Sequence, residues 1–154
     1  MTVDVMLPNA EQLHKAFRGE GNAALTSVID AASRMIPIHH KRKEAIRRMQ
    51  QPDGMSGNEL RRAVGDFTAA ESSLASLATA IDRSVATALQ GRQHVSGVWH
   101  TETVGLVISR MAELWLSYIN SQAHEDAFRV ARMSDAYNCL ITELAEGRRL
   151  PPDM

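Results

Sequence analysis

The 154-residue sequence is poor in the residue types that would tie it to a compartment or to a covalent chemistry. It has one cysteine, Cys139, so an internal disulfide framework is excluded. Because Cys139 falls in a periodic helical pattern, we interpret it as a small buried hydrophobe. Aromatic residues are also scarce, with two tryptophans, two tyrosines and three phenylalanines. This scarcity favours helices packed through small and flexible side chains over a β-sandwich with large aromatic anchors.

Strong charge and long apolar runs are absent as well. The formal net charge is −1 and the pI is about 6.6, which is not the signature of a nucleic-acid or membrane-surface binder. No stretch approaches the ~18 consecutive apolar residues of a membrane span. The N-terminal segment, MTVDVMLPNAEQ, has no basic residue before a short apolar run and no cleavage pattern. We therefore expect a protein that is cytoplasmic at synthesis, with export by a route that reads no cleavable signal left open.

The sequence does contain helical periodicity along most of its length, which predicts an all-α protein, either a helical bundle or a long helical hairpin. We expect three regions packed as a single domain: N-terminal helices in 1–51, part of which could be disordered, a long packing helix over 57–90, and a helical region over 102–146. In the first region a short helix should cover 10–18 and a second should begin at Asn22. Pro37 should break or kink that second helix, leaving a third piece over 38–51.

The long helix over 57–90 has the clearest start in the chain. Pro52-Asp53-Gly54 is a turn signal, and Ser56 followed by Glu59 is a capping box. The helix is rich in Ala, Ser and Thr, and its larger apolar residues recur at nearly heptad spacing. A 3.5-residue repeat requires a long helical partner. The residues of this helix that we expect to pack against the partner are Leu60, Phe67, Leu74, Leu77 and Ile81.

The last region, 102–146, should begin with a cap at Thr101. Its apolar pattern is interrupted near Ser121, so it is either one bent helix or two helices. Trp115 lies within the apolar stripe and should anchor the core. Trp99 lies in a glycine-bearing loop, and the sequence leaves two roles open for it: a core residue, or an exposed contact residue at a protein interface.

Candidate chemistry is thin, and we predict no catalytic residue, no cofactor and no metal. His94, His100 and Glu102 cluster around a loop but lack the spacing of a known metal motif, so exposed loop histidines are the preferred interpretation. Cys139 has no helix N-terminus or basic neighbour that would lower its pKa, and the serines lack a strained nucleophile elbow. The sequence therefore predicts a protein that is not an enzyme.

The segment HHKRKEAIRRM, residues 39–49, is the strongest charged feature. It holds five lysines or arginines and one glutamate. The basic face over 39–48 can bind an acidic partner protein; nucleic acid ranks lower because no aromatic residue interleaves the charges and no second positioning element is evident. The partner-binding candidates are Lys41, Arg42, Lys43, Arg47, Arg48 and Trp99.

Residues 13–90 resemble the inner-rod subunits of bacterial type III secretion systems and, more distantly, the needle subunits. Three segments carry the resemblance in chain order: EQLHKAFRGEGNAALTSVIDAASRMI, MQQPDGMSGNELRRAVGDF and SSLASLATAIDRSVATAL. The resemblance covers about half of the chain, and residues 91–154 have no counterpart in it. It implies a self-associating structural subunit without a cofactor, in which the packing residues of 57–90 contact further copies of the chain.

Two hypotheses follow. The first is a self-associating structural subunit of a secretion apparatus, with the chain itself as partner. The second is a folded helical bundle that acts as an adaptor, chaperone or regulator by binding another protein. In the second hypothesis, 57–90 folds back on 102–146 as an antiparallel pair, and 22–51 supplies further helices.

Overall fold

The protein is all-α, as the periodicity predicts. The computed structural model describes residues 7–20, 27–51, 53–91, 102–149 and 151, and within these ranges it contains five α-helices and no β-strand. Their bounds are Ala10–Phe17 (α1), Ser27–Gln50 (α2), Gly57–Leu89 (α3), Val104–Ser121 (α4) and His124–Ala145 (α5).

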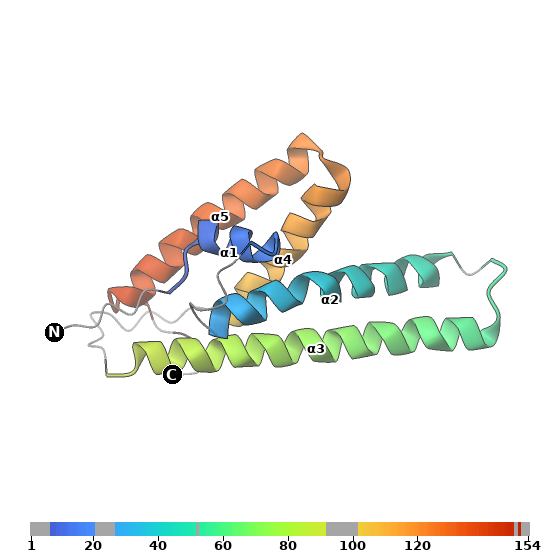
Figure 1. Ribbon diagram of the computed structural model, residues 1–154, viewed down its shortest axis with the longest axis horizontal. Helices are drawn as coiled ribbons and strands as arrows, with labels where there is room; N and C mark the ends of the chain where they lie inside the picture. Colours follow the sequence, from blue (N-terminus) through green and yellow to red (C-terminus); the bar gives the residue numbers. More distant parts are fainter. Residues whose placement is uncertain (1–6, 21–26, 52, 92–101, 150, 152–154) are drawn as a thin grey trace.

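The helices form two hairpins that meet at one end of the molecule (Figure 1). We call this end, where α1 also packs, the base. Helices α2 and α3 run antiparallel side by side and make the longer hairpin. Helices α4 and α5 make a shorter one, which diverges from the first, and α1 packs against α2, α4 and α5 near the base. All five helices contribute buried side chains to one core, among them Leu13, Met35, Ile81, Ile108 and Tyr137.

Helix α2 continues through Pro37, so the prediction of a break at this proline and of a separate piece over 38–51 is wrong. A proline inside a helix costs ~3 kcal/mol, because it removes one backbone hydrogen bond and its ring crowds the preceding turn. Burial of Met35 before the proline and of Ala45 after it offsets this cost. Pro37 itself is exposed, so water can reach the backbone that it leaves unbonded. Asn22, the expected cap, lies outside the described residues.

The expected start of the long helix is confirmed. The Ser56 side chain accepts a hydrogen bond from the amide of Glu59 at 3.2 Å, and the Glu59 side chain accepts one from the amide of Ser56 at 3.3 Å. A second capping box, between Asn9 and Gln12, starts α1. At the other end of α3, Gly91 has a φ of +79°, a value that favours glycine.

The region 102–146 is two helices. Gln122 adopts the left-handed conformation with φ 53°, which ends α4, and the Ser121 hydroxyl accepts from the amide of Ala123 at 3.1 Å. The cap of α4 is Thr103, which accepts from the amide of Leu106, and the expectation of a cap at Thr101 is wrong. Val104, the first residue of α4, is buried in the core.

Helix α5 exposes its outer face, and this corrects the interpretation of Cys139. The buried residues of α5 are Tyr137, Leu140 and Leu144, which lie on one side of the helix. Cys139 lies on the other side and is exposed. No neighbouring helix covers that side in the described part of the chain, so a residue of apolar character remains in contact with solvent.

The long antiparallel partner of α3 is α2, not 102–146 as the bundle hypothesis expects. Helix α4 instead meets α3 at one close approach, where a Cβ on Gly105 would overlap the backbone carbonyl of Ala78. The buried side of α3 is also shifted from the predicted seam, because two helices, α2 and α4, cover it and not one. It comprises Ala63, Ala70, Leu74, Ala78, Ile81, Val85 and Leu89.

Candidate interaction surface

The far ends of α2 and α3 extend beyond the rest of the molecule as a projecting two-helix arm, which we define as residues 41–50 and 57–71 (Figure 1). In contrast to the base, the arm buries only three residues: Ala45, Ala63 and Ala70. Small side chains at these positions let the two helices approach closely. The remaining side chains of the arm are exposed or half-buried, and they are available to a partner.

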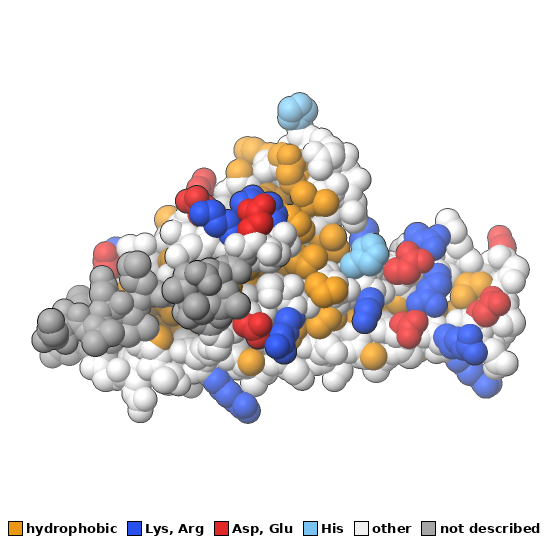
Figure 2. All heavy atoms as spheres, in the orientation of Figure 1, with side chains coloured by type: hydrophobic (Ala, Val, Ile, Leu, Met, Phe, Trp, Pro, Cys, Tyr) orange, Lys and Arg blue, Asp and Glu red, His pale blue; other side chains and the backbone are white. Residues whose placement is uncertain are grey.

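The arm carries most of the basic residues of the N-terminal half. It holds seven lysines or arginines and four glutamates or aspartates, whereas the whole chain has a net charge of −1. Figure 2 shows these charged side chains gathered along the arm and hydrophobic side chains gathered over α4 and α5. The two hairpins therefore present surfaces of different character on the same face of the molecule.

Two of the predicted partner-binding arginines hold the arm together. Arg42 forms an ion pair with Glu71 on α3, lies 5.4 Å from the centroid of the Phe67 ring, and reaches Glu113 on α4 at 3.8 Å. Arg48 donates to Asp66 on α3 at 2.6 Å. Both arginines link α2 to another helix, and their charges are already partly compensated.

Arg47 pairs within its own helix. It donates to Glu44 at 2.6 Å and 3.1 Å, and both side chains are well exposed. The hydrogen bond from Arg47 lowers the pKa of the Glu44 carboxyl and raises the pKa of the Arg47 guanidinium. Exposed ion pairs of this kind contribute little to stability, so a partner carboxylate could replace Glu44 at little cost.

The cations that remain are Lys41 and Lys43 on α2 and Arg61 and Arg62 on α3. All four are exposed, and none forms an ion pair within the described part of the chain. Sequence reasoning identified the two lysines and missed the two arginines. The signal that could have found them is the turn at 52–54, because a hairpin about that turn brings the start of α3 beside the basic end of α2.

The predicted packing residues of 57–90 lie in different environments. Leu74 and Ile81 are in the core, and Leu77 packs partly buried against it. Phe67 is half-buried under Arg42. Leu60 is 41% exposed near the end of the arm, where Val64 is also exposed.

Trp99 lies outside the described residues, whereas Trp115 is a core residue that packs against Phe17 at 6.0 Å between ring centroids.

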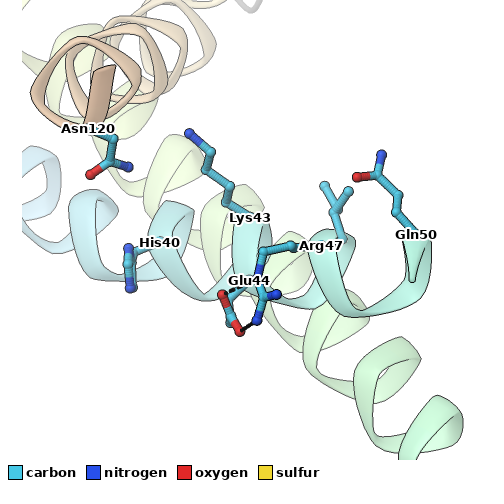
Figure 3. Close-up of a pocket in the computed structure, with 7 residues that line it drawn as sticks. His40, Lys43, Glu44, Arg47, Gln50 and Asn120 are labelled. Carbon is cyan, nitrogen blue, oxygen red and sulfur yellow. Dashed lines mark hydrogen bonds and ion pairs between the residues drawn. The ribbon is translucent and has the colours of Figure 1, made fainter. Parts of the chain in front are cut away.

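A hollow of about 390 Å³ opens between α2 and the end of α4 (Figure 3). Six of its lining residues come from α2, and Asn120 comes from α4. Lys43, Arg47 and Gln50 line it along α2, and Ile46 supplies an apolar side chain. The hollow thus combines basic groups, the Glu44 carboxylate, amides and apolar surface.

Two histidines form part-buried, hydrogen-bonded links between helices. His39, on α2, is hydrogen-bonded through Nε2 to the Ser109 hydroxyl on α4 at 3.0 Å. His14, on α1, is hydrogen-bonded to the Ser134 hydroxyl on α5 at 3.0 Å. Burial is the main cause that lowers the pKa of each imidazole, and Arg18 adds to the effect on the pKa of His14. Ser109 lies inside a regular helix and lacks the strained turn that exposes a serine nucleophile, so we interpret the pair as a structural link.

Within the described ranges, no group of three or more His, Cys, Asp or Glu side chains is arranged to hold a metal ion. Of the loop candidates, His94 and His100 lie outside these ranges. No helix among the described residues combines the length and hydropathy needed to cross a bilayer. No protein-family model, curated protein or solved structure matches the chain.

Proposed function

We propose that this chain is a non-enzymatic helical protein that binds an acidic partner protein through its arm. The observation that carries the proposal is the set of four exposed cations, Lys41, Lys43, Arg61 and Arg62, without ion-pair partners in the described part of the chain. They lie on a two-helix arm whose exposed surface is not part of the core. Unpaired charges of one sign attract and orient an oppositely charged surface.

A protein partner is favoured over nucleic acid by what the arm lacks. Base stacking requires accessible aromatic rings, and Phe67, the aromatic residue of the arm, is half-buried under Arg42. Leu60 and Val64 are exposed beside the basic residues. Apolar groups next to charges are common at protein interfaces, where the apolar part is desolvated and the charged rim gives specificity.

The test uses the free lysines, because reversing Arg48 would also break its link to Asp66. The double variant Lys41→Glu with Lys43→Glu is compared with wild type by copurification from cells that express the protein, followed by quantitative mass spectrometry. We expect one or a few acidic proteins to be lost with this variant. The matched control is Arg83→Glu with Arg132→Glu, which makes the same change in net charge away from the arm. Partners retained by both variants, or lost from both alike, would contradict the proposal.

A second candidate is the self-associating structural subunit of type III secretion inner-rod type. It is supported by the outer side of α3, where short uncharged residues are exposed over several turns: Thr68, Ala69, Ser72, Ser76, Thr79 and Ala80. Such a face permits close helix packing between copies. It predicts oligomers that grow with concentration and that are lost when Ser76 is replaced by Arg. A monomer at all concentrations in light scattering would exclude it.

A further inference from the structure

A second hollow, of about 330 Å³, lies at the end of the arm, where α2 ends and α3 begins. Its lining contains three arginines and one carboxylate: Arg47, Arg48, Arg62 and Glu59. Gln51 adds an amide. Arginines from both helices of the arm therefore line the same small space.

The carboxylates near these arginines do not neutralise the hollow from within. Arg47 pairs with Glu44 and Arg48 pairs with Asp66, and neither of these two carboxylates lines the hollow. Glu59 does line it, but its side chain accepts a backbone amide in the capping box of α3 at 3.3 Å. The lining thus keeps an excess of positive charge.

Two of the arginines also have donors without acceptors. Arg62 is exposed and its side chain forms no ion pair or hydrogen bond within the described ranges, so its whole guanidinium is available. The Nε–H group of Arg48 is buried and has no acceptor in the described part of the chain. Buried N–H groups in proteins are nearly always hydrogen-bonded, so this one calls for an acceptor that the chain itself does not supply.

We propose that this hollow binds the phosphate group of a phosphorylated serine or threonine in the acidic partner protein. A phosphate monoester carries about −1.5 to −2 charge and three acceptor oxygens, so it can pair with more than one arginine at once, and guanidinium groups hold such oxygens in bidentate pairs. Met55, half-buried in the lining, offers an apolar contact to the hydrocarbon part of the phosphorylated side chain. The proposal rests on the proposed function of the arm and names the group that the arm recognises.

A phosphorylated protein is favoured over nucleic acid by the other residues of this region. None of the six residues that line the hollow is aromatic, so a base has no ring on which to stack. Leu60 and Val64 are exposed on either side of Arg62 in the sequence of α3. Apolar side chains of a peptide can cover them, as is common at protein interfaces.

The test uses the adjacent residues Arg61 and Arg62 as a matched pair. Both are exposed on α3, but only Arg62 lines the hollow. Replacement of either by glutamine removes one positive charge, so a general loss of attraction to an acidic ligand is the same in both variants. The probes are two fluorescently labelled, glutamate-rich peptides of otherwise identical sequence, with phosphoserine at the centre of one and glutamate at the centre of the other.

Fluorescence anisotropy with the full chain should give a dissociation constant roughly tenfold lower for the phosphoserine peptide. Arg62→Gln should abolish this preference, whereas Arg61→Gln should weaken binding of both peptides alike and keep it. Arg62→Lys, which retains the charge but loses the planar fork, should lose most of the preference as well. Far-UV circular dichroism of each variant checks that the helices are intact.

The outcomes separate this proposal from the function of the arm. Equal binding of the two peptides, weakened by Lys41→Glu with Lys43→Glu, would support an arm that binds acidic proteins and overturn the phosphate site. A preference for phosphoserine that survives Arg62→Gln would place the phosphate elsewhere and also overturn the site. If neither peptide binds, the phosphate site is wrong, and the copurification experiment, which requires no phosphate, decides the function of the arm independently. Tighter binding of a single-stranded oligonucleotide, with the same dependence on Arg62, would show that the ligand is a nucleic acid and not a phosphoprotein.

Discussion

Helix α3 passes through two environments, and the contrast between its two ends shows which part of the molecule forms the core and which part is left exposed. Its C-terminal half lies in the base, where Leu74, Ile81 and Val85 are buried by residues from the other helices. Its N-terminal half lies in the arm, where only Ala63 and Ala70 are buried. Hydrophobic burial therefore stabilises the base, and the arm keeps its form through one neighbouring helix and a few ion pairs. A surface held in this way is free to bind a partner without a cost to the core.

The largest expected difference is between equivalent truncations at the two ends of α3. Ile81 is fully buried, so Ile81→Ala should lower the free energy of unfolding by about 3 kcal/mol through lost burial and a residual cavity. Leu60 is 41% exposed, and Leu60→Ala should lower it by less than about 1 kcal/mol. Urea unfolding followed by circular dichroism measures both values. Equal losses would mean that the arm is buried as deeply as the base.

Two glycine-to-alanine substitutions should change the stability of the protein in opposite directions, one in the base and one in the arm. At Gly105 in the base a Cβ would overlap the backbone of Ala78, so Gly105→Ala should destabilise the protein by about 1–3 kcal/mol. At Gly65 in the arm a Cβ meets nothing within 4 Å. Gly65→Ala should stabilise the helix by about 0.5–1 kcal/mol, because alanine is the better helix former.

The same unfolding measurement tests this pair, with Gly65→Ala as the control for the general effect of alanine on helix formation. If Gly105→Ala were also stabilising, α3 and α4 could separate without loss, and the close crossing would not be a fixed feature of the base. Thermal melting of both variants would then show the same upward shift.

Local signals in the sequence predicted the elements better than their packing. The capping box at Ser56 and Glu59 has a short-range mechanism, so it placed the start of α3 correctly. Pro37 misled the prediction because a local rule cannot include the tertiary burial of Met35 and Ala45. Cys139 misled it because periodicity shows that one face is apolar but not whether another helix covers it.

The candidate surface was also predictable only in part, because the sequence shows the charges and only the fold shows their partners. The run at residues 39–49 identified the basic residues of α2, but charge alone does not show which of them are already paired. Only the hairpin brings Arg42 to Glu71 and Arg48 to Asp66, and so separates these arginines from the free lysines. It also brings Arg61 and Arg62 to the same arm, although they lie across a turn in sequence.

The smallest predicted effect is a pH dependence of stability, which arises from a buried histidine of the base. His39 is buried between α2 and α4, with Ser109, Glu113 and Arg42 as its polar neighbours and Glu71 near the same arginine. Because burial lowers the pKa of His39 in the folded protein, the unfolded chain binds the proton more readily. The contribution of His39 to stability is therefore complete above the unfolded value of about 6.5 and is lost as pH falls through the lower folded pKa.

Replacing His39 with glutamine keeps a hydrogen-bonding partner for Ser109 and removes the titration. Between pH 7.5 and 5 the free energy of unfolding of wild type should fall more steeply than that of His39→Gln, by less than the ~1.4 kcal/mol per pH unit that a full proton would give. A slope should remain in the variant, because burial also lowers the pKa of His14. His40→Gln, at an exposed position on the next residue of α2, is the control for the substitution itself. Identical slopes for wild type and His39→Gln would show that water reaches the interface between α2 and α4, and the base would then be less closed than the burial of His39 indicates.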